Sequence, residues 1–304
     1  MRPVHAIVDS DAFRWVTKRG PTRAVFRSDA YGRLDRARRK AWAARAARRE
    51  QPFGAVRVFC CFVGHNKSGT SMVGALLDAH PRMVVSDEVD ALSYVDAGFR
   101  RDELFHLLLR GTRTEARKGR VTARRLEPYS YLVPGQSQGS AEQPLVVGDS
   151  TSGSSTRRLG ADPDLLSRTR QLVGVDVRLV QVVRNPFDPI GVMIVRGKRT
   201  FANSINHYFR ACEVLRDLRA QLGPDELLTV RYEDFCADPT RELLRLCAFL
   251  GVDAHETYLR DCSSIIRRTP TRDRERVQWT EALIGEVQDR MADFDFLEGY
   301  SYAA

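Results

Sequence analysis

The sequence has no long apolar run, which argues against a membrane-spanning protein. A helix that crosses a bilayer needs roughly 18 or more consecutive apolar residues, and no stretch of the 304 residues approaches that length. The first residues, MRPVHAIVDSD, include acidic side chains where a secretory signal has its apolar centre. We therefore expect a protein without a transmembrane segment, located in the cytoplasm.

Cysteine is scarce, and its spacing is unlike that of a metal site. The six cysteines include no C-x-x-C pair. Cys60 and Cys61 are neighbours inside an apolar stretch, where a free thiol usually packs in the core. We expect neither a disulfide framework nor a metal site, and reduced thiols agree with a cytoplasmic location.

Acidic residues are outnumbered, with 39 against 48 lysines and arginines, which gives a net charge of +9. Many of the basic residues lie between positions 33 and 49, where alanines also favour a helix. Such a cluster can contact nucleic acid, an acidic partner or a membrane surface, but a solvated helix is the simpler interpretation. No nucleic-acid partner is expected.

Short apolar stretches rich in β-branched residues alternate with segments of helical periodicity. This alternation predicts an α/β fold: a doubly wound, mainly parallel central sheet with a P-loop-like strand-loop-helix and helices on both faces. The strands are expected at 56–63, 83–85, 145–149, 179–183 and 227–230, and the clearest helices at 201–222, 240–250 and 277–291.

The composition also suggests how the chain is divided. Residues 1–54 lack strand periodicity and are predicted to form an N-terminal extension with the basic helix. Residues 55–304 are expected to form one domain. Within it, charges, glycines and prolines between 110 and 143 indicate a variable insertion that shapes an acceptor pocket. The run of hydroxyls at 150–156 is expected to be a flexible loop.

The segment from Val56 to Ala79 combines an apolar strand, a loop and a helix. The loop lies between Gly64 and Gly69 and opens into the helix. The first amides of a helix have no acceptors inside the helix and, together with the positive end of the helix dipole, favour an anion. A phosphate or sulfate group is therefore predicted to bind at this loop.

This loop differs in one respect from the nucleotide-binding signature G-x-x-x-x-G-K-[ST]. Gly64, Gly69 and Ser71 are in register with the signature, but Thr70 occupies the position of its lysine. A lysine appears earlier instead, at Lys67. A kinase or ATPase needs its lysine on the β- and γ-phosphates, so the displaced lysine favours a different group transfer.

Three segments, in order, resemble the PAPS-dependent sulfotransferase family. NKSGTS at 66–71 resembles the loop that binds the 5′-phosphosulfate of 3′-phosphoadenosine-5′-phosphosulfate (PAPS). VQVVRNPFD at 180–188 resembles the segment that binds the 3′-phosphate. TVRYEDF at 229–235, followed by Pro239 and the pair Leu250-Gly251, resembles a later segment of the family.

The resemblance implies a role for each matching residue. Lys67 would lie near the bridging oxygen of PAPS and offset the charge that develops as the product PAP leaves. Arg184 would bind the 3′-phosphate through its planar guanidinium. Tyr232 matches a position close to adenine in some relatives, although a core tyrosine is an equally good interpretation. The 5′-phosphate would be held by Ser68, Gly69, Thr70 and Ser71, and no metal is implied.

The sequence also departs from the family. A serine or threonine usually follows the arginine by eight residues, and Val192 stands there; Ser150 likewise replaces a frequent lysine. The 3′-phosphate must then be held by Arg184 with other donors, or it is held less well. Arg272, Arg274 and Arg276 are candidates by location alone, because the family often closes over the nucleotide with a basic loop.

The general base is the least defined part of the site. The chain has no K-x-H motif of the kind that supplies a histidine base in many relatives. Glu88 resembles the glutamate that other relatives use after the second strand, and a carboxylate can accept the acceptor's proton; capping of a helix is its alternative role. Poorer candidates for the base are His65, His207 and Asp149.

These observations favour a sulfotransferase that moves a sulfuryl group from PAPS to a hydroxyl of a small-molecule, lipid or glycan acceptor by in-line transfer. A P-loop NTPase or kinase is the first alternative, because LVVGD at 145–149 resembles a Walker B segment. A non-enzymatic nucleic-acid-binding protein, using the basic stretch 33–49, is the second.

Overall fold

The computed structural model describes residues 29–87, 89–121, 129–197 and 199–304, with the side chains of 29–31 left aside. The chain forms two compact units, Met1–Glu50 and Gln51–Ala304. The described part of the first unit is helix α4 (Asp29–Arg49), in which Arg39 pairs with Asp35 at 2.6 Å between Nε and Oδ2. The second unit contains all the strands described below.

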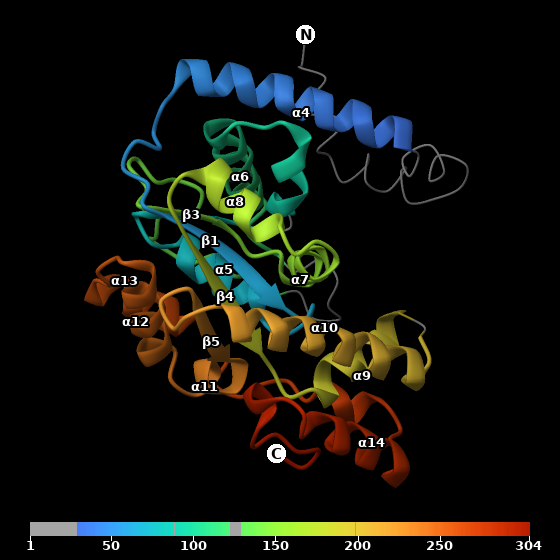
Figure 1. The fold of residues 1–304 in the computed structure, drawn as a ribbon. Coiled ribbons are helices and arrows are strands. Elements are labelled where there is room, and N and C mark those ends of the chain that lie inside the picture. Colours follow the sequence, from blue (N-terminus) through green and yellow to red (C-terminus); the bar gives the residue numbers. More distant parts are fainter. Residues whose placement is uncertain (1–28, 88, 122–128, 198) are drawn as a thin grey trace. The chain divides into compact units, whose positions relative to one another are not determined.

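Five parallel strands form the central sheet of the second unit, in the order β2-β3-β1-β4-β5 (Figure 1). The first strand in the sequence is central, and the chain adds strands on both of its sides, as in a doubly wound sheet. The predicted fold class is confirmed. The strands are β1 (Val58–Gly64), β2 (Met83–Ser86), β3 (Val146–Asp149), β4 (Asp176–Val183) and β5 (Leu227–Arg231).

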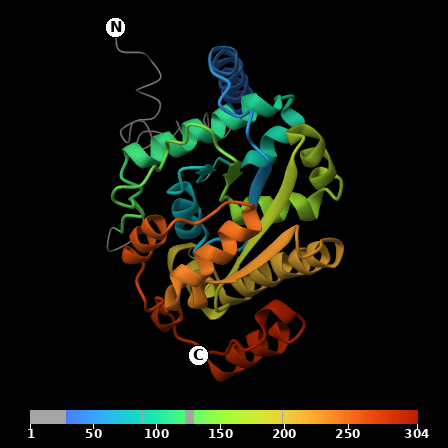
Figure 2. The same cartoon turned by 90° about the vertical axis from the view of Figure 1, so that its left-hand side faces the viewer.

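Helices cover both faces of this sheet (Figures 1 and 2). They are α5 (Thr70–Asp78), α6 (Arg101–Arg117), α7 (Ser152–Ala161), α8 (Leu165–Val173), α9 (Phe187–Gly197), α10 (Phe201–Gln221), α11 (Tyr232–Ala237), α12 (Pro239–Leu250), α13 (Glu256–Ser264) and α14 (Glu281–Met291). Short 3₁₀ turns lie at Ala91–Ala97, Asp273–Arg276 and Asp295–Leu297.

The alternation of side chains along β1 explains why helices pack on both faces of the sheet. Every residue of β1 is buried, and successive side chains of a strand point to opposite faces. Cys60 belongs to the apolar cluster that α5, α12 and α13 complete. On the other face, Phe59 stacks on Phe105 of α6 at 6.1 Å between ring centroids. The sulfur of Cys61 lies 3.7 Å from the hydroxyl oxygen of Ser155 in α7. Burial on both faces is typical of a parallel sheet.

Helix α7 corrects a prediction from the sequence. The hydroxyl-rich run at 150–156 was expected to be a flexible loop, but α7 begins at Ser152. The hydroxyl groups of this helix form hydrogen bonds with nearby backbone groups and leave the helix intact. Thr156 donates to the Ser152 carbonyl at 3.1 Å and accepts from the Gly64 amide at 2.8 Å. Ser155 likewise donates to the Thr151 carbonyl. Side chains that favour turns in isolation are compatible with a helix when they bond back in this way.

The 110–143 segment begins as a continuation of α6, which reaches Arg117. Farther along, Gln138 donates through Nε2 to the carbonyl of Ala75 at 2.7 Å and to that of Tyr131 at 2.9 Å. These bonds attach the segment to α5. Residues 122–128 lie outside the described residues, and the predicted acceptor-side role of the segment stays a prediction.

One buried carboxylate joins several of these elements. Asp78, at the end of α5, accepts from the amides of Val85 and Gly139, both at 2.9 Å, and from the Thr112 hydroxyl and the Arg120 guanidinium. Burial raises the pKa of Asp78 to about 6, against the lowering effect of Arg120. The carboxylate ties α5 to β2, to α6 and to the segment that follows α6.

The six cysteines are all buried free thiols. None of the helices described here combines the length and the apolar character needed to cross a membrane. Neither observation tests the predicted cytoplasmic location, which stays a prediction.

Candidate functional site

Parallel pairing brings two predicted binding segments together. In the sheet, Gly64 at the end of β1 lies opposite Val182 near the end of β4. The loop of residues 65–69, here called the anion loop, follows β1, and Arg184 follows β4. Because the carboxyl ends of parallel strands share one edge of the sheet, these segments meet at that edge.

The anion loop makes a tight turn with left-handed backbone. Gly64, Lys67 and Gly69 have φ angles of 126°, 75° and 99°. Glycine adopts such angles readily, whereas a lysine there is uncommon and is held by its surroundings. One restraint is direct, because the carbonyl of Lys67 accepts from Arg184 Nη1 at 3.1 Å.

The helix start after the loop presents donors without acceptors. The amides of Met72 and Val73 bond to the Gly69 carbonyl at 3.0 and 3.1 Å, whereas those of Thr70 and Ser71 have no acceptor within the described residues. The hydroxyl of Ser68 is also buried without a partner in the described part of the chain. Buried polar groups are nearly always bonded, so this arrangement fits an anion that accepts from all three groups.

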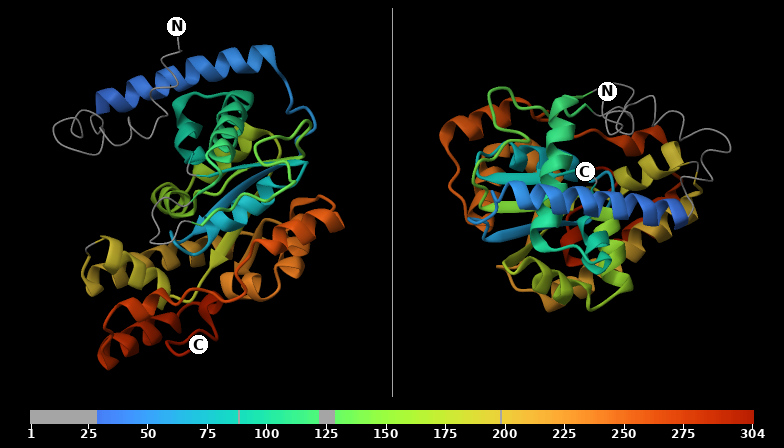
Figure 3. Two further views of the ribbon diagram at one scale, coloured as in Figure 1. Left: turned by 180° about the vertical axis from the view of Figure 1, so that it is seen from behind. Right: turned by 90° about the horizontal axis from the view of Figure 1, so that it is seen from above.

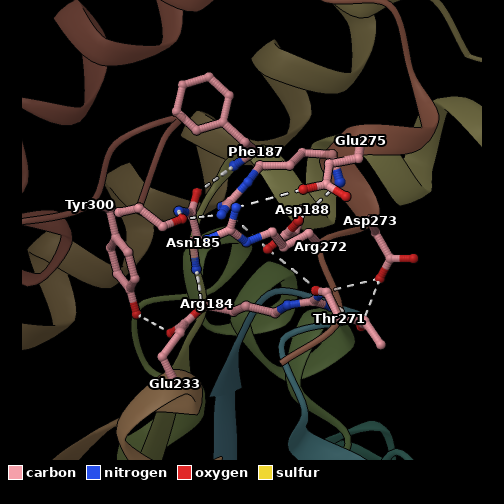
Figure 4. Close-up of polar contacts among 12 residues, drawn as sticks. Arg184, Asn185, Phe187, Asp188, Glu233, Thr271, Arg272, Asp273, Glu275 and Tyr300 are labelled. Carbon is pink, nitrogen blue, oxygen red and sulfur yellow. Dashed lines mark hydrogen bonds and ion pairs between the residues drawn. The ribbon is translucent and has the colours of Figure 1, made fainter. Parts of the chain in front are cut away.

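Arg184 is buried rather than open to solvent, with 5% of its side chain exposed. Its Nη2 donates to the hydroxyl of Thr271 at 3.1 Å, to the Thr271 carbonyl and to Asp273 Oδ2 at 3.1 Å (Figure 4). The carboxylate of Asp188 lies 3.6 Å from the same nitrogen. The predicted phosphate-binding arginine is therefore next to the anion loop, but protein groups already surround it.

Tyr232 packs against both predicted anion-binding elements. It is the first residue of α11, and the Arg184 Cζ lies 5.2 Å from the centre of its ring. A Cβ atom added to Gly69 would overlap this ring, so glycine is required there by the close approach as well as by its φ. Burial raises the pKa of the Tyr232 hydroxyl. The tyrosine thus forms one wall of the site.

The three C-terminal arginine candidates have different environments. Arg274 is buried, its amide donates to Asp188 at 2.9 Å, and its guanidinium bonds to the Ala304 carbonyl, so it serves the packing of this segment. Arg272 and Arg276 are about half exposed and lie 3.6 Å from Glu275 and Asp273. Val192, where relatives carry a hydroxyl, is buried and apolar. The hydroxyl at Arg184 comes from Thr271 instead.

The structure separates the base candidates. Glu88 lies outside the described residues. The His65 ring stacks on Tyr208 at 3.7 Å between centroids, and its Nε2 is 3.4 Å from the Cys212 sulfur. Burial lowers the pKa of His65 to about 3, so its ring is neutral at working pH but enclosed. His207 lies on the exposed side of α10, and partial burial is the main cause of its lowered pKa.

Asp149 is enclosed as well. It accepts from the Ala91 amide at 2.7 Å and from the Thr151 hydroxyl at 3.0 Å, which leaves it a role in holding the chain that follows β2. Burial raises the pKa of Asp149 to about 7, with Asp87 and Asp90 contributing through charge. Its full burial argues against contact with an acceptor.

Sequence reasoning missed Asp87, which the structure places beside the anion loop. Asp87 Oδ1 accepts from the Ser150 hydroxyl at 3.0 Å and from the Ser71 hydroxyl at 3.4 Å. The sequence contains an indication of this residue, because two acidic residues, Asp87 and Glu88, follow Ser86 at the end of β2. Only Glu88 was predicted to belong to the site. Ser150, which replaces a frequent lysine of the family, bonds to this carboxylate.

No group of three or more histidine, cysteine, aspartate or glutamate side chains suited to a metal ion occurs in the described ranges. In the Walker B-like segment, Asp149 is a buried acceptor of two hydrogen bonds.

Comparison with known proteins finds a family model that matches part of the chain. Residues 170–256 match the model of a family described as sulfotransferases. The matched part contains Arg184 and Tyr232 and thus two of the three segments that carried the resemblance. The predicted resemblance to the sulfotransferase family is confirmed over this part of the chain. No curated protein matches the chain in sequence.

Solved sulfotransferases are also similar, but weakly. The sulfotransferase domain of the olefin synthase from Synechococcus PCC 7002 is 21% identical, over 77% of this chain and 88% of that chain, with a TM-score of 0.46. Mouse sulfotransferase SULT7A1, complexed with PAP, is 12% identical over 81% and 84%, with a TM-score of 0.45. At TM-scores below 0.5, neither likeness decides the fold or the function of this chain.

The pKa of Asp149 predicts how stability depends on pH. The carboxyl has a pKa of about 7 in the folded protein and about 3.9 when unfolded. The folded state thus keeps a proton that the unfolded state loses, and this group's contribution to the free energy of unfolding decreases from about pH 4 to about pH 7. Asp149→Asn removes that loss. In thermal unfolding, the variant should gain about 2.6 kcal/mol on the wild type between pH 5 and pH 8, because this range covers about two of the roughly three pH units between the two pKa values.

Asp162→Asn is the matched control. The hydrogen bond from Arg168 lowers the pKa of Asp162, so its stabilising effect is complete above the unfolded pKa and is lost only toward lower pH. The difference between this variant and the wild type should be the same at pH 5 and pH 8. An equally flat difference for Asp149→Asn would contradict the raised pKa.

Proposed function

We propose that this protein of the sulfotransferase family transfers the sulfuryl group of PAPS to a hydroxyl of a small-molecule, lipid or glycan acceptor. The observation that supports this most is the meeting of the anion loop with Arg184 at one edge of the sheet, where Arg184 Nη1 lies 3.1 Å from the Lys67 carbonyl. PAPS carries one anionic group on the 5′ oxygen and another on the 3′ oxygen of its ribose, and this edge offers a separate protein group for each.

The 5′ side would be bound by the start of α5. The amides of Thr70 and Ser71 lack acceptors within the described residues. The buried hydroxyl of Ser68 also has no hydrogen-bond partner there, and a bound phosphate would supply one. Lys67, next in the loop and exposed, would offset the charge on the leaving oxygen. Such fixed donors and charges stabilise charge developing in a transition state without reorganisation, which is how a group transfer with little covalent chemistry is accelerated.

The 3′ side would be bound by Arg184, and the Thr271 hydroxyl, which accepts from Arg184 Nη2, would take the place of the hydroxyl that Val192 lacks. Tyr232 lies between Arg184 and Gly69, as a residue near the base of the nucleotide would. Arg272 and Arg276 are exposed enough to approach the same phosphate.

We retain Glu88 as the proposed base, which would accept the acceptor's proton as the new oxygen–sulfur bond forms. Asp87 would act through another group: its bonds with Ser71 and Ser150 orient the start of α5. The acceptor itself is proposed only by class, and the cytoplasm is proposed as the location.

A thermal-shift experiment distinguishes the proposal from its alternatives. PAP at 100 times its dissociation constant should raise the free energy of unfolding by about 2.7 kcal/mol without added metal. ATP with magnesium should have a smaller effect. Duplex DNA should bind only at low salt, through the basic stretch 33–49. A larger shift with ATP and magnesium than with PAP would favour the NTPase reading instead.

Lys67→Ala tests the role of the loop lysine. Removing a charge that acts mainly in the transition state should lower sulfuryl transfer about 100-fold or more, while the affinity for PAP changes little. Turnover is measured with labelled PAPS, and binding of PAP by calorimetry. Lys40→Ala, which removes an exposed lysine of α4 that belongs to none of the predicted PAPS-binding segments, is the control and should retain most of the turnover. Unchanged turnover in Lys67→Ala would remove the lysine from the mechanism.

Glu88→Gln and Asp87→Asn separate the base from the residue that positions the loop. Loss of a general base should lower the rate about 100-fold or more with PAP affinity unchanged. Asp87→Asn should instead weaken PAP binding, because Ser71 loses its carboxylate acceptor. The opposite pattern, with slow turnover and normal PAP binding only in Asp87→Asn, would move the base to Asp87.

A further inference from the structure

The contacts of Arg184 are unusual for a residue that should receive a phosphate. Its Nη2 faces three acceptors of the 271–276 segment: the carbonyl and hydroxyl of Thr271 and the carboxylate of Asp273. Its Nη1 is bonded to the Lys67 carbonyl. Its Nε is buried and has no partner among the described residues. A phosphate that approaches the guanidinium through Nη2 therefore competes with Asp273.

Asp273 is placed as an anion between two cations. Its Oδ2 lies 3.1 Å from Arg184 Nη2, and its Oδ1 lies 3.6 Å from Arg276 Nε (Figure 4 shows the first of these). Its side chain is 15% exposed, whereas that of Asp188, the other acid near Arg184, is 3% exposed. Of these two acids, Asp273 is the more accessible to solvent.

The backbone of this segment is closely packed, whereas the side chain of Asp273 is partly exposed. The segment packs against α9, and in Figure 3 (left) the red C-terminal part of the chain lies next to the olive helices of this region. A Cβ atom on Gly191 would lie 3.1 Å from the Asp273 carbonyl oxygen, which leaves no space between the two backbones. The next residue is anchored as well, since the Arg274 amide donates to Asp188 at 2.9 Å.

We propose that Asp273 is an internal competitor for the 3′-phosphate of the donor nucleotide. In the absence of nucleotide its carboxylate occupies Arg184, and a 3′-phosphate binds by displacing it. The displaced carboxylate keeps a cation, because Arg276 lies on its other side. The inference rests on the proposed function, since it assigns the 3′-phosphate to Arg184.

This arrangement affects the binding of only those nucleotides that carry a 3′-phosphate. A phosphate carries more charge than a carboxylate and offers more acceptor oxygens, so it can replace Asp273 at the guanidinium. A nucleotide without a 3′-phosphate leaves the Arg184–Asp273 pair intact and gains nothing from it. Asp273 thus lowers the affinity for 3′-phosphorylated nucleotides while it keeps a buried arginine paired in their absence, which a buried charge requires.

The test compares two nucleotides that differ only in the 3′-phosphate, PAP and adenosine 5′-monophosphate. Calorimetry with the full chain should show that Asp273→Asn binds PAP about tenfold more tightly than the wild type, the effect of removing one close competing charge. Binding of adenosine 5′-monophosphate should be unchanged. Asp273→Ser, which removes the carboxylate by a different route, should show the same selective gain, and circular dichroism establishes that both variants fold.

Glu286→Gln is the matched control, because it removes an exposed acid of α14, outside the 271–276 segment and outside the proposed binding groups. It should bind both nucleotides like the wild type. An unchanged or weaker affinity for PAP in both Asp273 variants would overturn the inference, as would an equal gain for adenosine 5′-monophosphate. If the wild type binds neither nucleotide, the proposed function fails and the inference fails with it; selective failure in the variants leaves the proposed function standing.

Discussion

The hydrogen bond from Arg184 to the Lys67 carbonyl is the interaction on which the site depends. It joins the turn after β1 to the turn after β4, and it forms because these two strands are parallel neighbours with Gly64 opposite Val182. The same guanidinium lies over Tyr232, which packs against Gly69. Two segments more than 100 residues apart in the chain are thereby held as one surface. Rigid strands position this surface, whereas the groups that touch ligands come from the turns.

The sequence predicted the parts of the fold that local patterns encode. Each of the five strands was expected close to its observed position, because continuous apolar runs have few structural alternatives in a buried parallel sheet. The loop between Gly64 and Gly69 was recognisable from its glycines and from the helix that follows. Helix α7 was missed because serine and threonine favour turns when considered alone. Their acceptors here, such as the Gly64 carbonyl for Thr156, come from elsewhere in the chain.

The site was predictable only in part for a similar reason. Arg184 could be named from its motif, but its partners Thr271 and Asp273 lie almost 90 residues later, and no local pattern connects them. Asp87 was not predicted as a site residue although it adjoins Glu88. The sequence does not show which of two neighbouring carboxylates turns toward Ser71, and in the structure Asp87 bonds to it. Burial also decides chemistry that composition leaves open. His65 and Asp149 are titratable groups near the loop, yet both are enclosed and bonded within the fold.

The carboxylate of Asp78 has a consequence for how this architecture can be diversified. Its partners Thr112, Arg120 and Gly139 lie on α6 and on the chain that follows α6. The negative charge of α5 in the core is therefore paired with a positive charge from that region. A chimaera that exchanged the region without its arginine would strand a carboxylate in the core. Transplantation of this region between homologues is therefore constrained by an electrostatic requirement at α5, independently of any shape that the exchanged surface presents to a substrate.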